Sequence, residues 1–153
     1  MHRAFLALLC LLSPVALAAV PPATPAIIEP EADDRTFAAA DVHMVTAPFA
    51  DADGDGHRCS DWEIREHAEI VWSAVCVTGS TAIHIHLGDG TFGSGRSGLS
   101  DDTAYVLRVR HRDDSNDPAS EWSDGSERRF RTTIGSPMPP LLARDFLTQP
   151  APR

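Results

Sequence analysis

Carboxylates at alternate positions, followed by a glycine, occupy residues 51–56, which have the one-letter sequence DADGDG. Calcium takes oxygen ligands that converge on one point, and glycine permits the sharp backbone turn that such a loop needs. The predicted calcium ligands are Asp51, Asp53, Asp55, His57 (through its carbonyl) and Asp61. The match is partial, because Trp62 stands where a calcium loop places a bidentate glutamate, although Glu63 follows directly. The alternative is an ordinary turn between two strands, and any bound calcium is expected to be structural.

His84 and His86 form a second group of candidate ligands. Residues two apart on a strand project from the same face. A His-x-His pair is a common half of a zinc site, to which His57 or His111 could add a third ligand, as a small metallohydrolase would need. No Asp or Glu flanks the pair, so we favour the alternative of two solvent-facing histidines.

Arginines at alternate positions mark a basic stripe late in the chain. The stripe consists of Arg108, Arg110 and Arg112. If Asp61 and Glu63 lie on the neighbouring strand, they face this stripe and form a cross-strand charge ladder. A guanidinium could also stack on Trp122. We expect a structural role, and the alternative is a ligand-binding face for acidic glycans or a partner.

Charge and motif content argue against several classes of function. The chain has 22 acidic and 13 basic residues, all of the latter arginine, for a net charge of -9. Such an acidic chain is a poor candidate for binding nucleic acid or anionic membranes. No serine lies in a Gly-x-Ser-x-Gly elbow, and the glycine-rich residues 93–98 lack the end of a phosphate loop. Asp113 and Asp114 are interpreted as solvated turn residues. A non-enzymatic protein is therefore expected.

Residues 1–18 have the basic start, apolar run and small-x-small end of a secretory signal. A membrane anchor is the less favoured alternative, because the run is short and interrupted by Pro14. Export predicts a secreted, periplasmic or cell-surface protein, without membrane insertion after cleavage. It also leaves two cysteines, Cys59 and Cys76, in an oxidising compartment. A predicted hairpin of residues 60–65 and 70–77 brings them within range of a disulfide. Two separate buried thiols are the alternative.

The remaining chain divides into three parts by composition. Residues 19–40 are rich in Pro and Ala and are expected to form a disordered leader. Residues 41–134 alternate short β-type runs with Gly, Asp and Ser clusters, which predicts about seven antiparallel strands in an all-β sandwich. Strands are expected at 43–49, 61–65, 70–77, 81–87, 103–112 and 128–133. Residues 135–153 are expected to be a proline-rich linker or tail.

The predicted domain resembles a fibronectin type III module of the subtype found in exported bacterial multidomain proteins. The motifs that carry the resemblance lie at residues 49–55, 60–64, 71–72, 98–99, 105–113, 120–123 and 130–132. The resemblance covers the folded unit and none of the tails. It implies an immunoglobulin-like sandwich of two sheets, with Tyr105 as the buried tyrosine near the start of the sixth strand.

These observations predict a non-enzymatic, exported module that acts as a spacer or as an adhesion or recognition domain. Its protein or glycan ligand is not identified by the sequence, and an adjoining C-terminal domain is expected. The alternative is a carbohydrate- or surface-binding accessory module of a larger secreted enzyme. In that case Trp72, Trp122 or the arginine stripe would form the binding face.

Overall fold

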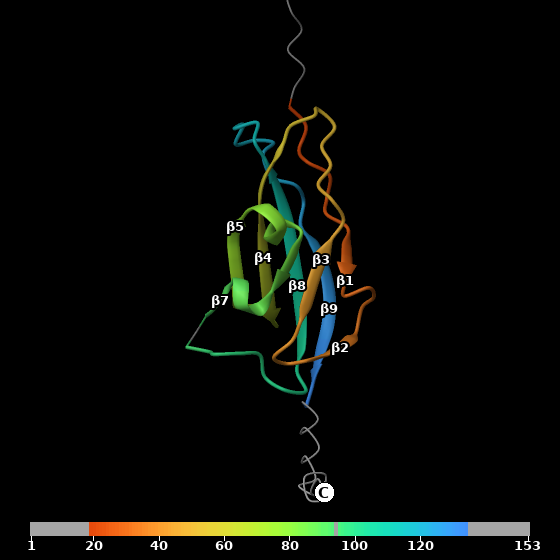
Figure 1. The fold of residues 1–153 in the computed structure, drawn as a ribbon, viewed down its shortest axis with the longest axis vertical. Coiled ribbons are helices and arrows are strands. Elements are labelled where there is room, and N and C mark those ends of the chain that lie inside the picture. Colours follow the sequence, from red (N-terminus) through yellow and green to blue (C-terminus); the bar gives the residue numbers. More distant parts are fainter. Residues whose placement is uncertain (1–18, 94, 135–153) are drawn as a thin grey trace, which may run out of the picture.

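The computed structural model describes residues 19–93 and 95–134, which form two facing β-sheets (Figure 1). The smaller sheet has the strand order β1 (Ile27–Glu29), β3 (His43–Thr46) and β6 (His84–His86). The larger sheet has the order β2 (Arg35–Ala38), β9 (Ser126–Thr133), β8 (Ala104–Asp113), β4 (His57–Glu66), β5 (Glu69–Val77) and β7 (Thr91–Phe92). Every strand pair is antiparallel except β2–β9. The predicted all-β sandwich is confirmed.

Alternation of apolar and polar residues explains how the large sheet faces the core. In β8 the side chains of Tyr105, Leu107 and Val109 are buried, and the residues between them are only partly buried. Successive side chains of a strand point to opposite faces, so this pattern aims one face inward. The centre of the core contains Trp62, Trp72, Met44, Ile85 and Phe130. Both sheets therefore contribute large apolar side chains to one interior.

Strands β4 and β5 form the predicted hairpin, with a turn at His67 and Ala68. His67 has a φ of 56°, the left-handed conformation that such a tight connection needs. The sulfur atoms of Cys59 and Cys76 lie 2.16 Å apart, which places the two residues at disulfide distance as expected. The cross-link joins the two strands of the hairpin within the larger sheet.

The segment 19–40, expected to be a disordered leader, instead contributes β1 and β2. Ile27 is buried in the core, and the ring of Phe37 packs edge-on against Phe130 at 6.0 Å. Each strand also joins a sheet edge, β1 beside β3 and β2 beside β9. The composition argument was wrong because a few apolar side chains and an available sheet edge outweigh the surrounding prolines.

Two expected strands are shorter than predicted. The segment 81–87 is divided into the 3-10 helix η1 (Gly79–Ala82), strand β6 and the 3-10 helix η2 (Leu87–Asp89). The first expected strand, 43–49, ends at Thr46 as β3. The signal and tail predictions, 1–18 and 135–153, lie outside the described residues. Within the described part of the chain, no helix has the length and apolar character needed to cross a membrane.

The chain enters and leaves the sandwich at opposite ends of its long axis (Figure 1). Residues near 20 lie at one end, here called the N-proximal end, and strand β9 finishes at the other. The loop containing residues 51–56 also lies at the N-proximal end. Backbone hydrogen bonds confirm this neighbourhood, because Ala23 N donates to Ala50 O at 2.9 Å and Ala47 N donates to Ala26 O at 2.8 Å.

Candidate functional site

The acidic loop at the N-proximal end brings together Asp51, Asp53 and Asp55. One carboxylate oxygen from each of the three residues lies within 4.8 Å of the other two. The Oδ1 atom of Asp51 accepts hydrogen bonds from the backbone amides of Asp53 (2.8 Å), Gly54 (3.0 Å) and Asp55 (3.2 Å). Gly54 supplies the turn with a φ of 88°. The loop is thus held in a bend that turns its carboxylates toward one another.

Two further carboxylates reach this loop from the end of β8. Asp114 Oδ1 accepts a hydrogen bond from Gly56 N at 2.7 Å, and Asp114 N donates to Gly56 O at 3.0 Å. Asp113 is fully buried, with its Oδ1 bonded to the amide and hydroxyl of Ser115. The expectation that Asp113 is a solvated turn residue was wrong, because its position on β8 continues the inward-facing series.

Two buried carboxylate oxygens at this end have no hydrogen-bond partner among the described residues. They are Oδ2 of Asp51 and Oδ2 of Asp113. The pKa of Asp55 is raised, first by desolvation and then by the negative charges of Asp51, Asp113 and the two other neighbouring aspartates. Buried acceptors without donors are costly, and like charges crowded together repel. A hard cation is the ligand that would relieve both.

The structure brings together the carboxylates of three predicted calcium ligands, Asp51, Asp53 and Asp55. His57 was predicted to bind through its carbonyl, which stays a prediction. The ring of His57 stacks on Phe49, with centroids 4.6 Å apart, and its Nε2 lies 2.9 Å from Ser60 Oγ. Asp61 Oδ2 binds the guanidinium of Arg110, and its Oδ1 accepts from Cys76 N at 2.8 Å. The carboxylate of Asp61 is therefore engaged in the sheet, and the prediction that it binds the ion was wrong. Sequence spacing could not show this, because strand register decides where Asp61 points.

His57 and His111 form a cluster of aromatic rings with Phe49. Their ring centroids are 4.7 Å apart, and His111 is 1% exposed. The pKa of His111 is lowered to about 4, first by burial and then by the neighbouring His57. Burial also lowers the pKa of His57.

His57 and His111, the two predicted candidates for a third ligand, do not lie with His84 and His86. The histidine that the structure brings to this pair is His43.

The arginine stripe is part of the sheet architecture. Arg110 lies opposite Asp61 in the register of β8 and β4, with Nη2 and Nε at 2.7 and 3.0 Å from Asp61 Oδ2. The guanidinium of Arg110 lies 4.0 Å from the centroid of the Trp122 ring. Arg108 lies opposite Glu63, but the carboxylate of Glu63 binds Arg65. The expected ladder is therefore formed at Arg110 and not at Arg108.

Trp72 and Trp122 differ in what they offer to a ligand. Trp72 is fully buried, and its Nε1 donates to Leu87 O at 2.9 Å. Trp122 is partly buried under the guanidinium groups of Arg110 and Arg112. The expectation that Trp72 could form a carbohydrate-binding face was wrong, because β5 turns this side chain into the core.

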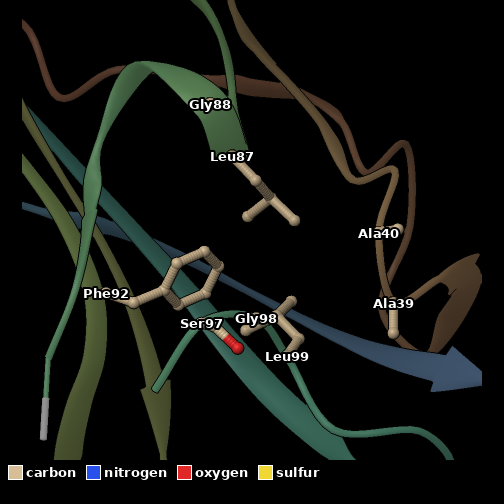
Figure 2. A pocket seen from close by; sticks show the side chains of 8 residues that line it. All are labelled: Ala39, Ala40, Leu87, Gly88, Phe92, Ser97, Gly98 and Leu99. Atoms are coloured by element: carbon tan, nitrogen blue, oxygen red, sulfur yellow. The ribbon is translucent and has the colours of Figure 1, made fainter. Parts of the chain in front are cut away.

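An apolar hollow of about 320 Å³ lies beside η2 and β7 (Figure 2). The side chains of Leu87, Phe92 and Leu99 converge on it. The other lining residues are Ala39, Ala40, Gly88, Ser97 and Gly98. The lining side chains carry no charge, and the hydroxyl of Ser97 is their single polar group. The hollow therefore offers packing surface but no group that could perform acid–base chemistry.

Tyr105 forms a corner at the start of β8. Its hydroxyl accepts a hydrogen bond from Ser100 N at 2.9 Å, five residues upstream, and its ring is buried. Immunoglobulin-like sandwiches contain such a tyrosine corner near the start of the sixth strand.

Neither a protein-family model nor a curated protein sequence matches the chain.

Proposed function

We propose that this chain is an exported, non-enzymatic module of the fibronectin type III kind, which acts as a spacer or as an adhesion or recognition domain. Several features support a module of the fibronectin type III kind. They are the motifs of the sequence, the tyrosine corner at Tyr105, the buried Trp62 in β4 and the pairing of a three-stranded sheet with a larger one. The cysteine pair at disulfide distance supports an oxidising compartment.

The observation that carries the spacer function is the arrangement of the chain along the long axis (Figure 1). A domain that receives the chain at one end and releases it at the other sets the segment that follows it at a fixed distance and direction from the N-proximal end. No catalytic geometry is needed for that task, and the adjoining C-terminal domain remains part of the proposal.

The same proposal places a structural calcium ion in the acidic loop. Asp51, Asp53 and Asp55 would provide three of the oxygen ligands, and the unpartnered Oδ2 of Asp113 supports a cation nearby. The loop lies at the N-proximal end and is bonded to residues that precede β1. Calcium at this position would stiffen the loop and the segment that leads into β1.

The experiment is a calcium titration of the untagged chain by calorimetry, with unfolding temperature as a second measurement. Sites of extracellular modules bind calcium with a Kd of about 0.1–1 mM. For a Kd of about 0.1 mM, about 2 mM calcium stabilises the fold by roughly 1.8 kcal/mol, or about 7–14 °C. Asp53→Asn should weaken binding by about tenfold or more, because one charged ligand is lost.

Asp102→Asn is the matched control, because it removes one charge at an exposed position and asparagine tolerates its φ of 46°. This control should bind calcium like the parent chain. Absence of a heat of binding and of any temperature shift at millimolar calcium would reduce the loop to an ordinary turn.

A further inference from the structure

Three histidines from two paired strands share the outward face of the smaller sheet. His43 of β3 lies opposite His86 in the register with β6, and His84 lies two residues before His86. The alternate residues Met44 and Ile85 are buried, so the histidines point away from the core. One ring nitrogen from each histidine lies within 4.8 Å of the other two.

The hydrogen bonds around His43 determine which of its nitrogens is free. His43 Nδ1 lies 2.7 Å from Glu29 Oε2, and an ionised carboxylate can only accept. Nδ1 therefore carries the proton, and Nε2 of the neutral ring presents its lone pair. That Nε2 lies 2.9 Å from Nε2 of His84. A carboxylate behind a histidine ligand fixes the tautomer and raises the basicity of the ligating nitrogen.

Asp89 lies beside His86 but does not take the place that Glu29 takes behind His43. Asp89 Oδ2 is 3.6 Å from His86 Nδ1, beyond hydrogen-bond range, and accepts a hydrogen bond from the His86 backbone amide at 2.9 Å. The His86 side chain in turn accepts a hydrogen bond from the Asp89 backbone amide. These bonds hold the His86 ring in place, and Glu29 is the carboxylate that supports a histidine of the group as metal-binding histidines are supported in proteins.

We propose that His43, His84 and His86 bind a divalent transition-metal ion, with Zn²⁺ as the ion and Glu29 as a positioning residue. Metal–nitrogen bonds of about 2.0–2.1 Å set tetrahedral nitrogens about 3.4 Å apart. That spacing lies between the 2.9 Å that separates the Nε2 atoms of His43 and His84 and the 4.8 Å limit of the group. Because His84 and His86 are exposed, the fourth position faces solvent and is open to water or to a donor from a partner.

The site is independent of the proposed calcium loop. Imidazole nitrogens suit zinc and copper, whereas calcium and magnesium prefer oxygen ligands. The three histidines should therefore not bind calcium, and excess calcium should leave zinc binding unchanged. Copper(II) is expected to bind the same nitrogens more tightly than zinc.

The test is a zinc titration of the untagged chain by calorimetry, in buffer with excess calcium. We expect one zinc ion per chain, and at least about 100-fold weaker binding in His84→Ala. Glu29→Gln should weaken binding about tenfold, because the amide is a poorer partner for Nδ1. His67→Asn is the control, since this histidine lies in the exposed β4–β5 turn and should not affect binding.

Unfolding temperatures in zinc-free buffer show whether a variant binds zinc more weakly because a ligand is missing or because its fold is destabilised. The variants should unfold within a few degrees of the parent chain, because the substituted side chains lie on the surface. No zinc binding by the parent chain, or equal affinity in His84→Ala, would overturn the site. A Glu29→Gln variant with unchanged zinc affinity would overturn the positioning role of Glu29. Loss of zinc binding in Asp53→Asn with retention in His84→Ala would assign the ion to the acidic loop and likewise overturn the proposal.

Discussion

The backbone amide of Val20 donates a 2.7 Å hydrogen bond to Oδ2 of Asp53. This contact links the first residues that the structure describes to the tip of the acidic loop. A cation held by the loop would therefore act on the incoming chain as well as on the loop itself. Release of the cation would loosen both the acidic loop and the N-terminal segment that leads into β1.

Asp55→Asn should stabilise the calcium-free protein and weaken calcium binding. The pKa of Asp55 is raised by desolvation and by neighbouring carboxylates, so the folded state holds this proton more tightly than the unfolded state. Its destabilising effect therefore grows as pH rises through and above the ordinary value of 3.8. Thermal unfolding in chelator, measured from about pH 4 to pH 7, should show that the unfolding temperature of the variant exceeds that of the parent chain by an amount that grows with pH. A lower unfolding temperature for the variant in chelator would contradict this account.

Acid should destabilise the fold through His111. Its pKa falls from 6.5 in the unfolded chain to about 4 in the folded protein, so its stabilising effect is complete above 6.5 and is lost as pH falls toward 4. Between about pH 7.5 and pH 4.5 this amounts to roughly 2.5 kcal/mol. His111→Phe should remove that part of the pH dependence, as denaturant unfolding at several pH values would show. His67→Asn is the control and should keep the parent slope.

Arg110→Ala should lower stability by about 1–2 kcal/mol. The change removes a stack on Trp122 and leaves the largely buried carboxylate of Asp61 without its cation. Arg131→Ala should change stability by less than about 0.5 kcal/mol, since its ion pair with Asp102 is exposed. Urea unfolding of both variants measures the loss of stability caused by each change. Equal effects would argue against a structural role for Arg110.

Replacing both Cys59 and Cys76 by serine should cost about 3 kcal/mol, or roughly 10–15 °C in unfolding temperature. The cross-link closes a segment with a sequence separation of 17, and its loss frees the unfolded chain. Reductant should lower the unfolding temperature of the parent chain and leave the double variant unchanged. Alkylation of both cysteines in untreated protein would rule out the disulfide.

Local patterns predicted the features that a single strand or hairpin determines. The alternation in β8, the turn at His67 and the proximity of Cys59 to Cys76 all depend on neighbouring residues. The composition of residues 19–40 predicted a disordered leader. These residues instead form β1 and β2, on sheet edges that distant strands supply. Propensity cannot anticipate such an edge, whose location is known only once β3 and β9 are placed.

The candidate sites depended even more on long-range register. His43 joins His84 and His86 through the pairing of β3 with β6, strands that lie some 41 residues apart in the sequence. Asp113 reaches the acidic loop because β8 ends beside it. The residues next to His84 and His86 in the sequence gave no indication that His43 would join them.

The most direct test of the calcium account is a titration followed by backbone amide NMR. Calcium at millimolar concentration should shift the amides of Val20, Asp53, Asp55 and Gly56, while those of β6 stay in place. The same titration with Asp53→Asn should produce shifts only at about tenfold higher calcium or more. Unchanged amides in the acidic loop of the parent chain, or shifts confined to another part of the sandwich, would contradict the proposal that calcium binds where the chain enters.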